Sequence, residues 1–432
     1  MNKLFLDENN INDVLNELIK RSPNHYEEYE SVVYTIVNDV KAGGDDAVFE
    51  YTQKFDKYTL TKRKIRVTEA EIEEAYNSIS PEYIAVMKEA YEKIKSYHEM
   101  QVRNSFIHTY ENGSILGQRI TPIEKIGVYV PGGKAAYPSS TLMNIVPAIV
   151  AGCPRIIMCT PPNAKGKVNA GTLAAAKIAG VKEIYKVGGA QAIAAMAYGT
   201  ESVPKVDKIV GPGNIFVALA KKAVYGNVSI DSIAGPSEIL VLADETATPK
   251  FVACDLMSQA EHDEMASAIL VTTSEKLANE VIKEVEKRVK VAKRKEILKK
   301  SLDKYGFVLI CKNMDQAIET VNNIASEHLE IVTKNPYETM TKVKNAGAIF
   351  LGEYSSEPLG DYFAGPNHVL PTNGTAKFFS PLSVDDFIKK SSIINYSYDA
   401  LKEVAEKIEL FAEQEGLEAH ANSIRVRFED EE

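Results

Sequence analysis

The sequence contains few cysteines, and none of them has the spacing of a metal or redox motif. Its 432 residues include four, Cys153, Cys159, Cys254 and Cys311, with no CxxC pair among them. All four sit in or beside apolar segments, where an unreactive buried thiol is the usual state. A reducing compartment, the cytoplasm, is therefore expected. Cys153, in AGCPR, is the strongest of the four as a candidate catalytic nucleophile.

Long apolar runs and an excess of positive charge are also absent. The start, MNKLFLDENNINDVL, lacks the apolar core of a signal peptide, and no segment approaches the length of a membrane span. The net charge of −10 argues against a nucleic acid as a general partner. With 45% hydrophobic and 25% charged residues, the composition is that of a globular protein with two or three domains. Small molecules and other protein chains are the partners that this composition allows.

The first hundred residues have a strongly helical pattern. Thr68 and Glu71 form a capping-box pattern ahead of the run IEEAYNSI, which predicts the start of a helix. Pro81 is expected to open a second helix that runs to about residue 101. Residues 1–115 are therefore expected to form a helical region that packs on an α/β domain.

From about residue 115, short apolar runs alternate with alanine-rich helical runs. The expected strands include IGVYV and EILVLAD, and the expected helices include residues 248–262 and 274–299. Strand–helix alternation of this kind predicts parallel βαβ units. Two α/β domains are therefore expected, at residues 116–236 and 237–380.

The strand pattern ends after residue 375. A loop-rich stretch leads to the helical run YDALKEVAEKIELFAEQEG and then to the acidic end FEDEE, which is expected to be solvated. Residues 381–432 are therefore expected to form a small C-terminal segment.

Three glycine-containing loops each follow an expected strand and precede an expected helix. They are VPGGKAAYPSS at 130–140, VGGAQA at 187–192 and VGPGN at 210–214. Backbone N–H groups and a helix N-terminus could bind an anion at such loops. None of the loops is GxGxxG, and tight turns between strands and helices need glycine in any case, so the pattern alone supports a phosphate-bearing ligand only weakly.

The segment DLMSQAEHDEMA places Gln259 and His262 three residues apart in the expected helix over 248–262. Residues at this spacing lie on one face of a helix, so an amide oxygen and an imidazole nitrogen would point the same way. The pair is either one corner of a metal site or a polar helix face. The stronger zinc motif HExxH is absent.

Further polar residues gather in the second half of the chain. Glu327 and His328, in SEHLE, stand where a helix gives way to a strand; they could form a proton-transfer pair, or His328 could simply favour a helix C-terminus. Asp361 lies in the unusual loop GDYFAGPNHVLPT, which also contains His368. Glu415 and His420 flank an expected helix stop at Gly416.

Four of these side chains would form a suitable set of metal ligands. The candidates provide two oxygen and two nitrogen donors, a mixture that suits zinc: Gln259, His262, Asp361 and His420. Their spacing does not show whether they converge.

The motifs, in this order, resemble those of the histidinol dehydrogenase family, over nearly the whole chain. The matching segments are IGVYVPGGKAAYPSSTLMN, VGGAQAIAA, GPGN, DSIAGPSEILV, SQAEHD, SEHLE, GDYFAGPNHVLPT and EGLEAH. The resemblance implies an α/β fold of two Rossmann-like parallel-sheet domains, with a helical N-terminal region and a small dimer-swapped C-terminal segment. It also implies that L-histidinol is oxidised to L-histidinaldehyde and then to L-histidine, with NAD as the hydride acceptor. These are the last two steps of histidine biosynthesis.

The resemblance further assigns roles to individual residues. Zinc would be bound by Gln259, His262, Asp361 and His420, and acid/base catalysis would fall to Glu327 and His328. The substrate would contact Ser237, Gln259, His262, His328, Asp361, Glu415 and His420, with His368 close by. NAD would contact Tyr129, Gln191 and Asn214, in the 116–236 domain. The family is homodimeric, so Glu415 and His420 would complete the site of the second subunit.

Simpler interpretations of some of these residues remain open. Ser237 could cap a turn, Tyr129 could be an ordinary strand aromatic, and Asn214 could be a helix N-cap. Two alternative functions also remain: a thiol-dependent aldehyde dehydrogenase that uses Cys153 with Glu327 as the water activator, and a non-catalytic ligand-binding protein stabilised by metal.

Overall fold

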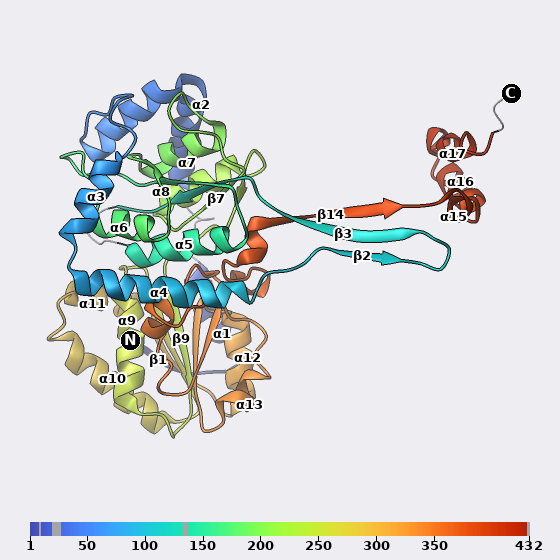
Figure 1. Ribbon diagram of the computed structural model, residues 1–432. Coiled ribbons are helices and arrows are strands. Elements are labelled where there is room, and N and C mark those ends of the chain that lie inside the picture. Colours follow the sequence, from blue (N-terminus) through green and yellow to red (C-terminus); the bar gives the residue numbers. More distant parts are fainter. Residues whose placement is uncertain (8–9, 20–26, 133–136, 430–432) are drawn as a thin grey trace. The chain divides into compact units, whose positions relative to one another are not determined.

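The structure is a computed structural model that describes residues 1–7, 10–19, 27–132 and 137–429. Contacts divide the chain into two units: one consists of Met1–Gln101 with Ile123–Phe387, and the other of Val102–Pro122 with Ile388–Glu432. The first unit contains two parallel sheets, and the second contains one antiparallel sheet (Figure 1). No helix in the described ranges is long and apolar enough to cross a membrane.

The first parallel sheet has five strands, in the order β6-β5-β4-β7-β8. Their bounds are β4 (Lys125–Tyr129), β5 (Arg155–Cys159), β6 (Glu183–Tyr185), β7 (Lys208–Val210) and β8 (Ser229–Ile230). One face packs against α2 (Glu27–Asp56), α7 (Gly189–Tyr198) and α8 (Ile215–Val224). The other face packs against α3 (Glu69–Ser78), α4 (Pro81–Glu99), α5 (Pro138–Val150) and α6 (Ala170–Ile178).

The second parallel sheet has six strands, in the order β1-β11-β10-β9-β12-β13. Their bounds are β1 (Asn2–Phe5), β9 (Glu238–Ala243), β10 (Ser267–Thr272), β11 (Gly306–Ile310), β12 (His328–Val332) and β13 (Ala348–Leu351). One face packs against α9 (Pro249–Ala260), α10 (Glu275–Val289) and α11 (Lys295–Tyr305), and the other against α1 (Asn10–Ile19) and α12 (Met314–Ile324). Shorter elements follow these: α13 (Pro336–Met340), α14 (Glu357–Tyr362), η2 (Thr375–Lys377) and η3 (Val384–Phe387).

The strands of both sheets are buried on their two faces, which explains their nearly continuous apolar sequences. Along β9, for example, Ile239 and Val241 enter the core under α9, while Leu240 and Leu242 enter the core under α12. Side chains of a strand alternate between faces, so an unbroken apolar run supplies both cores. The expected α/β fold with two parallel sheets is confirmed.

Two expected helix starts are also confirmed. Thr68 and Glu71 form the capping box in front of α3, with the Glu71 N–H donating to Thr68 Oγ1 and the Thr68 N–H donating to Glu71 Oε2. Pro81 occupies the first turn of α4, which ends at Glu99, and Ser80 is its N-cap.

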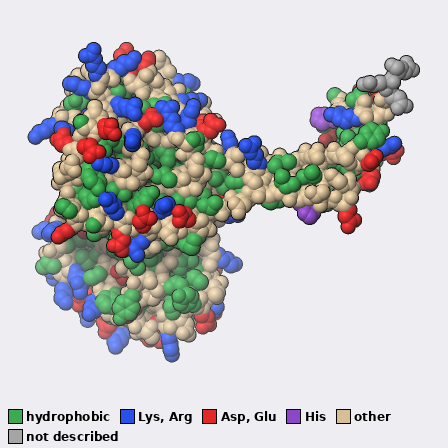
Figure 2. Space-filling view, in the orientation of Figure 1, with side chains coloured by type: hydrophobic (Ala, Val, Ile, Leu, Met, Phe, Trp, Pro, Cys, Tyr) green, Lys and Arg blue, Asp and Glu red, His purple; other side chains and the backbone are tan. Residues whose placement is uncertain are grey.

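The second unit is built on an antiparallel sheet, in the order β14-β3-β2, with β2 (Phe106–Thr109), β3 (Ile115–Pro122) and β14 (Ile388–Asn395). Three helices follow it: α15 (Tyr398–Lys402), α16 (Ala405–Gln414) and α17 (Glu418–Arg425). Many apolar side chains of this unit are exposed, and Figure 2 shows some of them on its surface. They include Phe106, Ile107, Ile394, Leu410, Phe411 and Val426.

Several expectations from the sequence were wrong. The first hundred residues are strongly helical as expected, with α1 to α4, but the strand β1, which joins the second parallel sheet beside β11, was not expected. Strands do not end at residue 375, because β14 pairs with β3 along its whole length. The side chains of β14 are mostly exposed, so its sequence shows no buried apolar pattern. The expected helix over 274–299 is two helices, α10 and α11, whose charged outer faces hide the break between them.

Candidate active site

The two acid/base candidates stand where β12 begins, beside the start of β9. The strands are parallel neighbours, with His328 paired to Ile239. The backbone of Glu238 binds both candidates: its N–H donates to Glu327 Oε2 at 2.8 Å, and its carbonyl oxygen lies 2.9 Å from His328 Nδ1. A carbonyl oxygen only accepts, so a proton on Nδ1 satisfies it. His328 Nε2 then retains its lone pair, and this atom has no partner among the described residues.

Burial sets the protonation of this pair. Both side chains are buried, and Glu327 Oε2 lies 3.6 Å from His328 Nδ1. Desolvation lowers the pKa of His328 to about 4, so its imidazole is neutral at physiological pH. Desolvation also raises the pKa of Glu327 well above its ordinary value, and the carboxylates of Glu238 and Asp361 raise it further. A neutral imidazole and a carboxyl of raised pKa are both suited to proton transfer.

Gln259 belongs to the last turn of α9 and is only 1% exposed. Its Nε2 lies 3.0 Å from His328 Nδ1, but both atoms are donors once Nδ1 carries the proton, so this contact is not a hydrogen bond. Its Oε1 has no partner in the described part of the chain. His262 does not share the helix, contrary to expectation: α9 ends at Ala260, and His262 is in the exposed turn that follows. That turn is closed by the His262 N–H, which donates to the Gln259 carbonyl oxygen at 3.1 Å.

Asp361 lies on the short helix α14, not in a loop as expected. Its Oδ1 is 3.9 Å from His328 Nε2 and 3.5 Å from His368 Nδ1. His368 Nδ1 also lies 3.0 Å from the Asp361 carbonyl oxygen, and its Nε2 lies 3.2 Å from Ser140 Oγ. Desolvation raises the pKa of the Asp361 carboxyl to about 6 and lowers that of His368 to about 4.

A further buried carboxyl, Glu357, was missed in the sequence analysis. Atoms of His328, Glu357 and Asp361 that could bind a metal all lie within 4.8 Å of one another. Glu357 accepts a hydrogen bond from Ser258 Oγ at 3.1 Å, and desolvation with the nearby Asp361 raises its pKa to about 8. Its spacing of four residues from Asp361 in EPLGD, which puts both on one helix face, was the signal that could have identified it.

The donor set of this cluster fits a transition metal. Gln259 Oε1 and His328 Nε2 are buried polar atoms without a hydrogen-bond partner among the described residues, and such atoms are costly unless something binds them. Asp361 adds a carboxylate next to His328. Carboxylate and amide oxygens with imidazole nitrogens are ligands that zinc accepts.

Three further candidates come from other segments of the chain. Ser237 directly precedes β9 and is half-buried, with its carbonyl oxygen accepting from the Ser267 N–H at 3.0 Å. Glu415 and His420 belong to the second unit, at the end of α16 and in α17, and both are exposed. Gly416, with φ of 73°, separates the two helices as expected.

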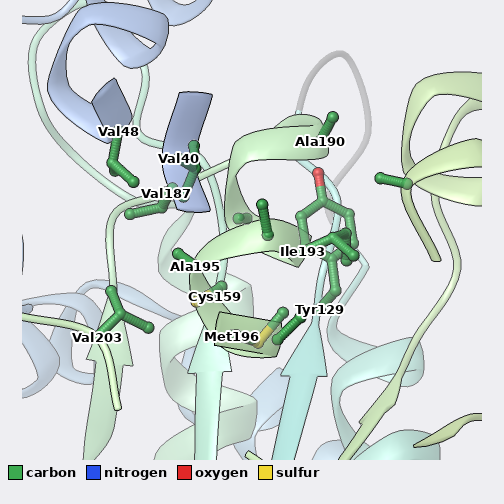
Figure 3. Packing of buried hydrophobic residues seen from close by; sticks show 14 of the residues in the cluster. Val40, Val48, Tyr129, Cys159, Val187, Ala190, Ile193, Ala195, Met196 and Val203 are labelled. Carbon is green, nitrogen blue, oxygen red and sulfur yellow. The ribbon is translucent and has the colours of Figure 1, made fainter. Parts of the chain in front are cut away.

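The three residues expected to contact NAD lie at the carboxyl edge of the five-stranded sheet. Tyr129 ends β4, and its hydroxyl accepts a hydrogen bond from the Gly189 N–H at 3.0 Å. In Figure 3 its ring lies beside Ile193 of α7, with the hydroxyl near the start of that helix. Gln191, in the first turn of α7, is 1% exposed, and neither polar atom of its amide has a partner among the described residues. Asn214 is the N-cap of α8, as the simpler interpretation has it.

Of the three glycine-containing loops, the one at 130–140 lies partly outside the described residues. The other two, at 187–192 and 210–214, each connect the carboxyl end of a strand to the start of α7 or α8. This is the edge of a parallel sheet where ligands usually bind. The cluster around His328, in contrast, lies at the amino ends of β9 and β12. Ligands bind less commonly at this edge of a parallel sheet.

Cys153 is poorly suited to act as a nucleophile. It lies between α5 and β5, and its Sγ is 3.6 Å from the Phe387 carbonyl oxygen. Burial raises the pKa of this thiol to about 11, which disfavours the reactive thiolate.

The two parallel sheets, with a buried Glu–His pair beside a cluster of metal-type donors, define an α/β enzyme. The model of the histidinol dehydrogenase family matches residues 19–428. The chain is 59% identical to histidinol dehydrogenase of Clostridium acetobutylicum over 91% of each chain, and 56% identical to that of Bacillus subtilis over 93% of each. A crystal structure of histidinol dehydrogenase from Elizabethkingia anophelis superposes with a TM-score of 0.93, at 39% identity, covering 99% of this chain and 98% of that one. The chain therefore belongs to the histidinol dehydrogenase family, a family of oxidoreductases.

We expect the His328 ring of the metal-free protein to remain neutral down to about pH 5, because the ordinary pKa of histidine is about 6.5 and burial lowers that of His328 to about 4. Nitrogen-15 NMR of labelled protein, with the His328→Gln variant to assign the signals, should show one neutral tautomer with the proton on Nδ1. A titration midpoint of His328 close to the ordinary histidine pKa, or a proton on Nε2, would contradict this description of the site.

Proposed function

We propose that this chain oxidises L-histidinol to L-histidinaldehyde and then to L-histidine, with zinc bound at the site and NAD as the hydride acceptor. The observation that carries the proposal is the Glu327–His328 pair, bound to one backbone residue, Glu238, beside the unpartnered Gln259 Oε1. Membership of the family supports the choice of substrate. The enzyme would thus supply histidine by two consecutive oxidations.

Gln259, His262, Asp361 and His420 are the residues that would hold zinc. When bound, the metal would orient the substrate through its imidazole and amine nitrogens and act as a Lewis acid. Glu357 would hold Asp361 in place from the same helix face, since the two carboxyls lie together. Oriented carboxylates of this kind are a common support for metal ligands.

Substrate binding would involve residues around this cluster. Ser237, His328 and Asp361 lie at or near the amino edge of the six-stranded sheet, and His368 contacts Asp361. The cluster contains several carboxyls, which would accept hydrogen bonds from the amine and hydroxyl groups of an amino alcohol. Glu415 would supply one more carboxylate from the second unit.

The acid/base residues divide the work between the two steps. His328 Nε2, with its free lone pair, would accept the hydroxyl proton of histidinol as the first hydride leaves. The proton on Nδ1, held by the Glu238 carbonyl oxygen, keeps the ring oriented for this transfer. Glu327, once ionised, would remove a proton from the water that attacks the aldehyde, and the resulting hydrate would release the second hydride. Burial would keep the reactive aldehyde inside the site between the steps.

NAD would bind at the carboxyl edge of the five-stranded sheet, near Tyr129, Gln191 and Asn214. The buried, unpartnered amide of Gln191 supports this placement, because a ligand group would satisfy it. NAD, when bound, supplies the hydride acceptor for each oxidation.

The second unit would pair two copies of the chain. Its exposed apolar side chains, on the antiparallel sheet and on α16 and α17, form a surface that a partner could cover (Figure 2). In a homodimer of this kind, Glu415 and His420 would complete the site of the partner. Their exposure in the isolated chain agrees with this role.

The direct test of the function is to mix the protein with L-histidinol and NAD and to follow NADH by absorbance. We expect two NADH for each histidinol consumed, with histidine as the product, and loss of activity after treatment with a chelator followed by recovery with zinc. Absence of NADH would exclude the oxidation and leave the alternative of a ligand-binding protein. Full activity in metal-depleted protein would exclude the role of zinc.

We expect Glu327→Gln to impair oxidation of the aldehyde much more than oxidation of the alcohol, because only the second step needs an activated water. Loss of a general base lowers a rate by about 10²–10⁴-fold, and we expect a loss of this size with histidinaldehyde as substrate. The half-reaction with histidinol in the same preparation is the control. Equal losses in both half-reactions would refute the division of labour between Glu327 and His328.

We expect Cys153→Ala to retain kcat/KM for histidinol within about twofold, as for a substitution away from the reacting groups. The raised pKa of its thiol and its position before β5 place it outside the chemistry. Steady-state kinetics with the wild-type chain alongside would show the difference. A loss of activity in a variant that still folds would favour the thiol-dependent alternative.

A further inference from the structure

Lys221 is among the largest fully buried side chains, although it is a lysine. It lies on α8 and is 2% exposed, in a core where its helix neighbours Leu219, Ala220 and Val224 are apolar. Its ammonium group forms an ion pair with Asp231, which directly follows β8 and is itself buried. Replacing such a pair by apolar residues is often neutral or stabilising, so general stability is a weak reason for its presence.

Both members of the ion pair form a hydrogen bond with the backbone of one residue, Gly211. Lys221 Nζ donates to the Gly211 carbonyl oxygen at 3.0 Å, and Asp231 Oδ2 accepts from the Gly211 N–H at 2.8 Å. Both backbone polar groups of Gly211 are therefore bound by the two members of the ion pair. Because Gly211 directly follows β7, the pair determines the direction in which the chain leaves the sheet.

Gly211 also has a conformation that only glycine adopts readily. Its φ is 122°, and a Cβ at this position would overlap the backbone carbonyl of Tyr129. At Gly211, the loop from Gly211 to Asn214 thus packs closely against the end of β4 and is hydrogen-bonded to Lys221 and Asp231. It then enters α8, whose first N–H groups are capped by Asn214.

This anchored loop borders the site proposed for NAD. Tyr129 joins the two glycine-containing loops, since its backbone touches Gly211 and its hydroxyl binds the Gly189 N–H. Gln191, with its unpartnered buried amide, follows Gly189 by two residues. A small shift of the loop at 211–214 would therefore change the surface that a dinucleotide meets.

We infer that Lys221 and Asp231 are positioning residues for the dinucleotide: they fix the loop at 211–214 through Gly211, and NAD affinity depends on them while the metal and histidinol sites do not. This inference rests on the proposed function, because it takes NAD as the ligand of this edge. Neither residue needs to touch NAD itself. Their contribution is to prepare the loop before binding, which reduces the entropy lost on binding.

The test compares Lys221→Met with a matched control in the full-length, zinc-loaded protein. The control is Lys208→Met, which removes a second buried lysine, paired with Asp386 at 3.3 Å, from the opposite end of β7. We expect Lys221→Met to raise the NAD dissociation constant, measured by calorimetry, and the KM for NAD by about tenfold or more, as for loss of preorganisation. Zinc content and the KM for histidinol should stay within about twofold, and Lys208→Met should leave NAD affinity within about twofold.

A second variant separates positioning from loss of stability. In the double variant K221Q/D231N an amide can still donate to the Gly211 carbonyl oxygen and a second amide can still accept from its N–H. We expect this variant to recover NAD affinity to within about threefold of wild type, because the hydrogen bonds to Gly211 are retained. Should Lys221→Met fail to fold, the double variant K221M/D231L replaces it, because it removes both hydrogen bonds to Gly211 without leaving an unpaired buried charge. We expect its loss of NAD affinity to be larger than that of Lys208→Met.

The outcomes are distinct. Unchanged NAD affinity in Lys221→Met, or equal losses for NAD and histidinol, would overturn the inference while leaving the proposed function intact. Failure of the wild-type chain to bind NAD would overturn both. Weakened NAD binding in Lys221→Met with recovery in the double variant would support the inference, since a merely structural role would not produce that pattern.

Discussion

The parallel pairing of β9 with β12 is the constraint on which the candidate active site depends. Because the strands start side by side, the peptide groups on either side of one residue, Glu238, face the side chains of Glu327 and His328. The N–H binds the carboxyl and the carbonyl oxygen binds the imidazole, so a single backbone segment fixes the orientation of both. A shift of register by one residue would send these side chains to the opposite face of the sheet.

Burial then gives these groups their chemistry. Carboxyl and imidazole groups out of water favour their neutral forms, and the structure places several carboxyls together around His328. Such a cluster is costly unless a cation offsets the charge. The unpartnered atoms of Gln259 and His328 are costly for the same reason. Both observations are explained if the site is completed by a metal ion and the bound substrate.

The sequence predicted the fold class and most strands correctly, because strands buried on two faces appear as unbroken apolar runs. It did not predict β14, whose exposed side chains have no such pattern, or the end of α9 before His262. Glu357 was overlooked because a single glutamate in a polar segment has no signature until the fold buries it beside Asp361. Spacing along the chain could not bring Gln259, His328 and Asp361 together, since strand order, not sequence distance, determines which loops meet.

A crystal structure of the zinc-loaded chain with histidinol would test the central claim most directly. We expect Gln259 Oε1 and an Asp361 carboxylate oxygen each to lie about 2.0–2.2 Å from zinc, and His420, from this chain or from a second copy, to complete the set. His328 Nε2 should then face the hydroxyl of histidinol. Zinc bound at other residues, with Gln259 turned away and His420 far from the metal in both copies, would contradict it.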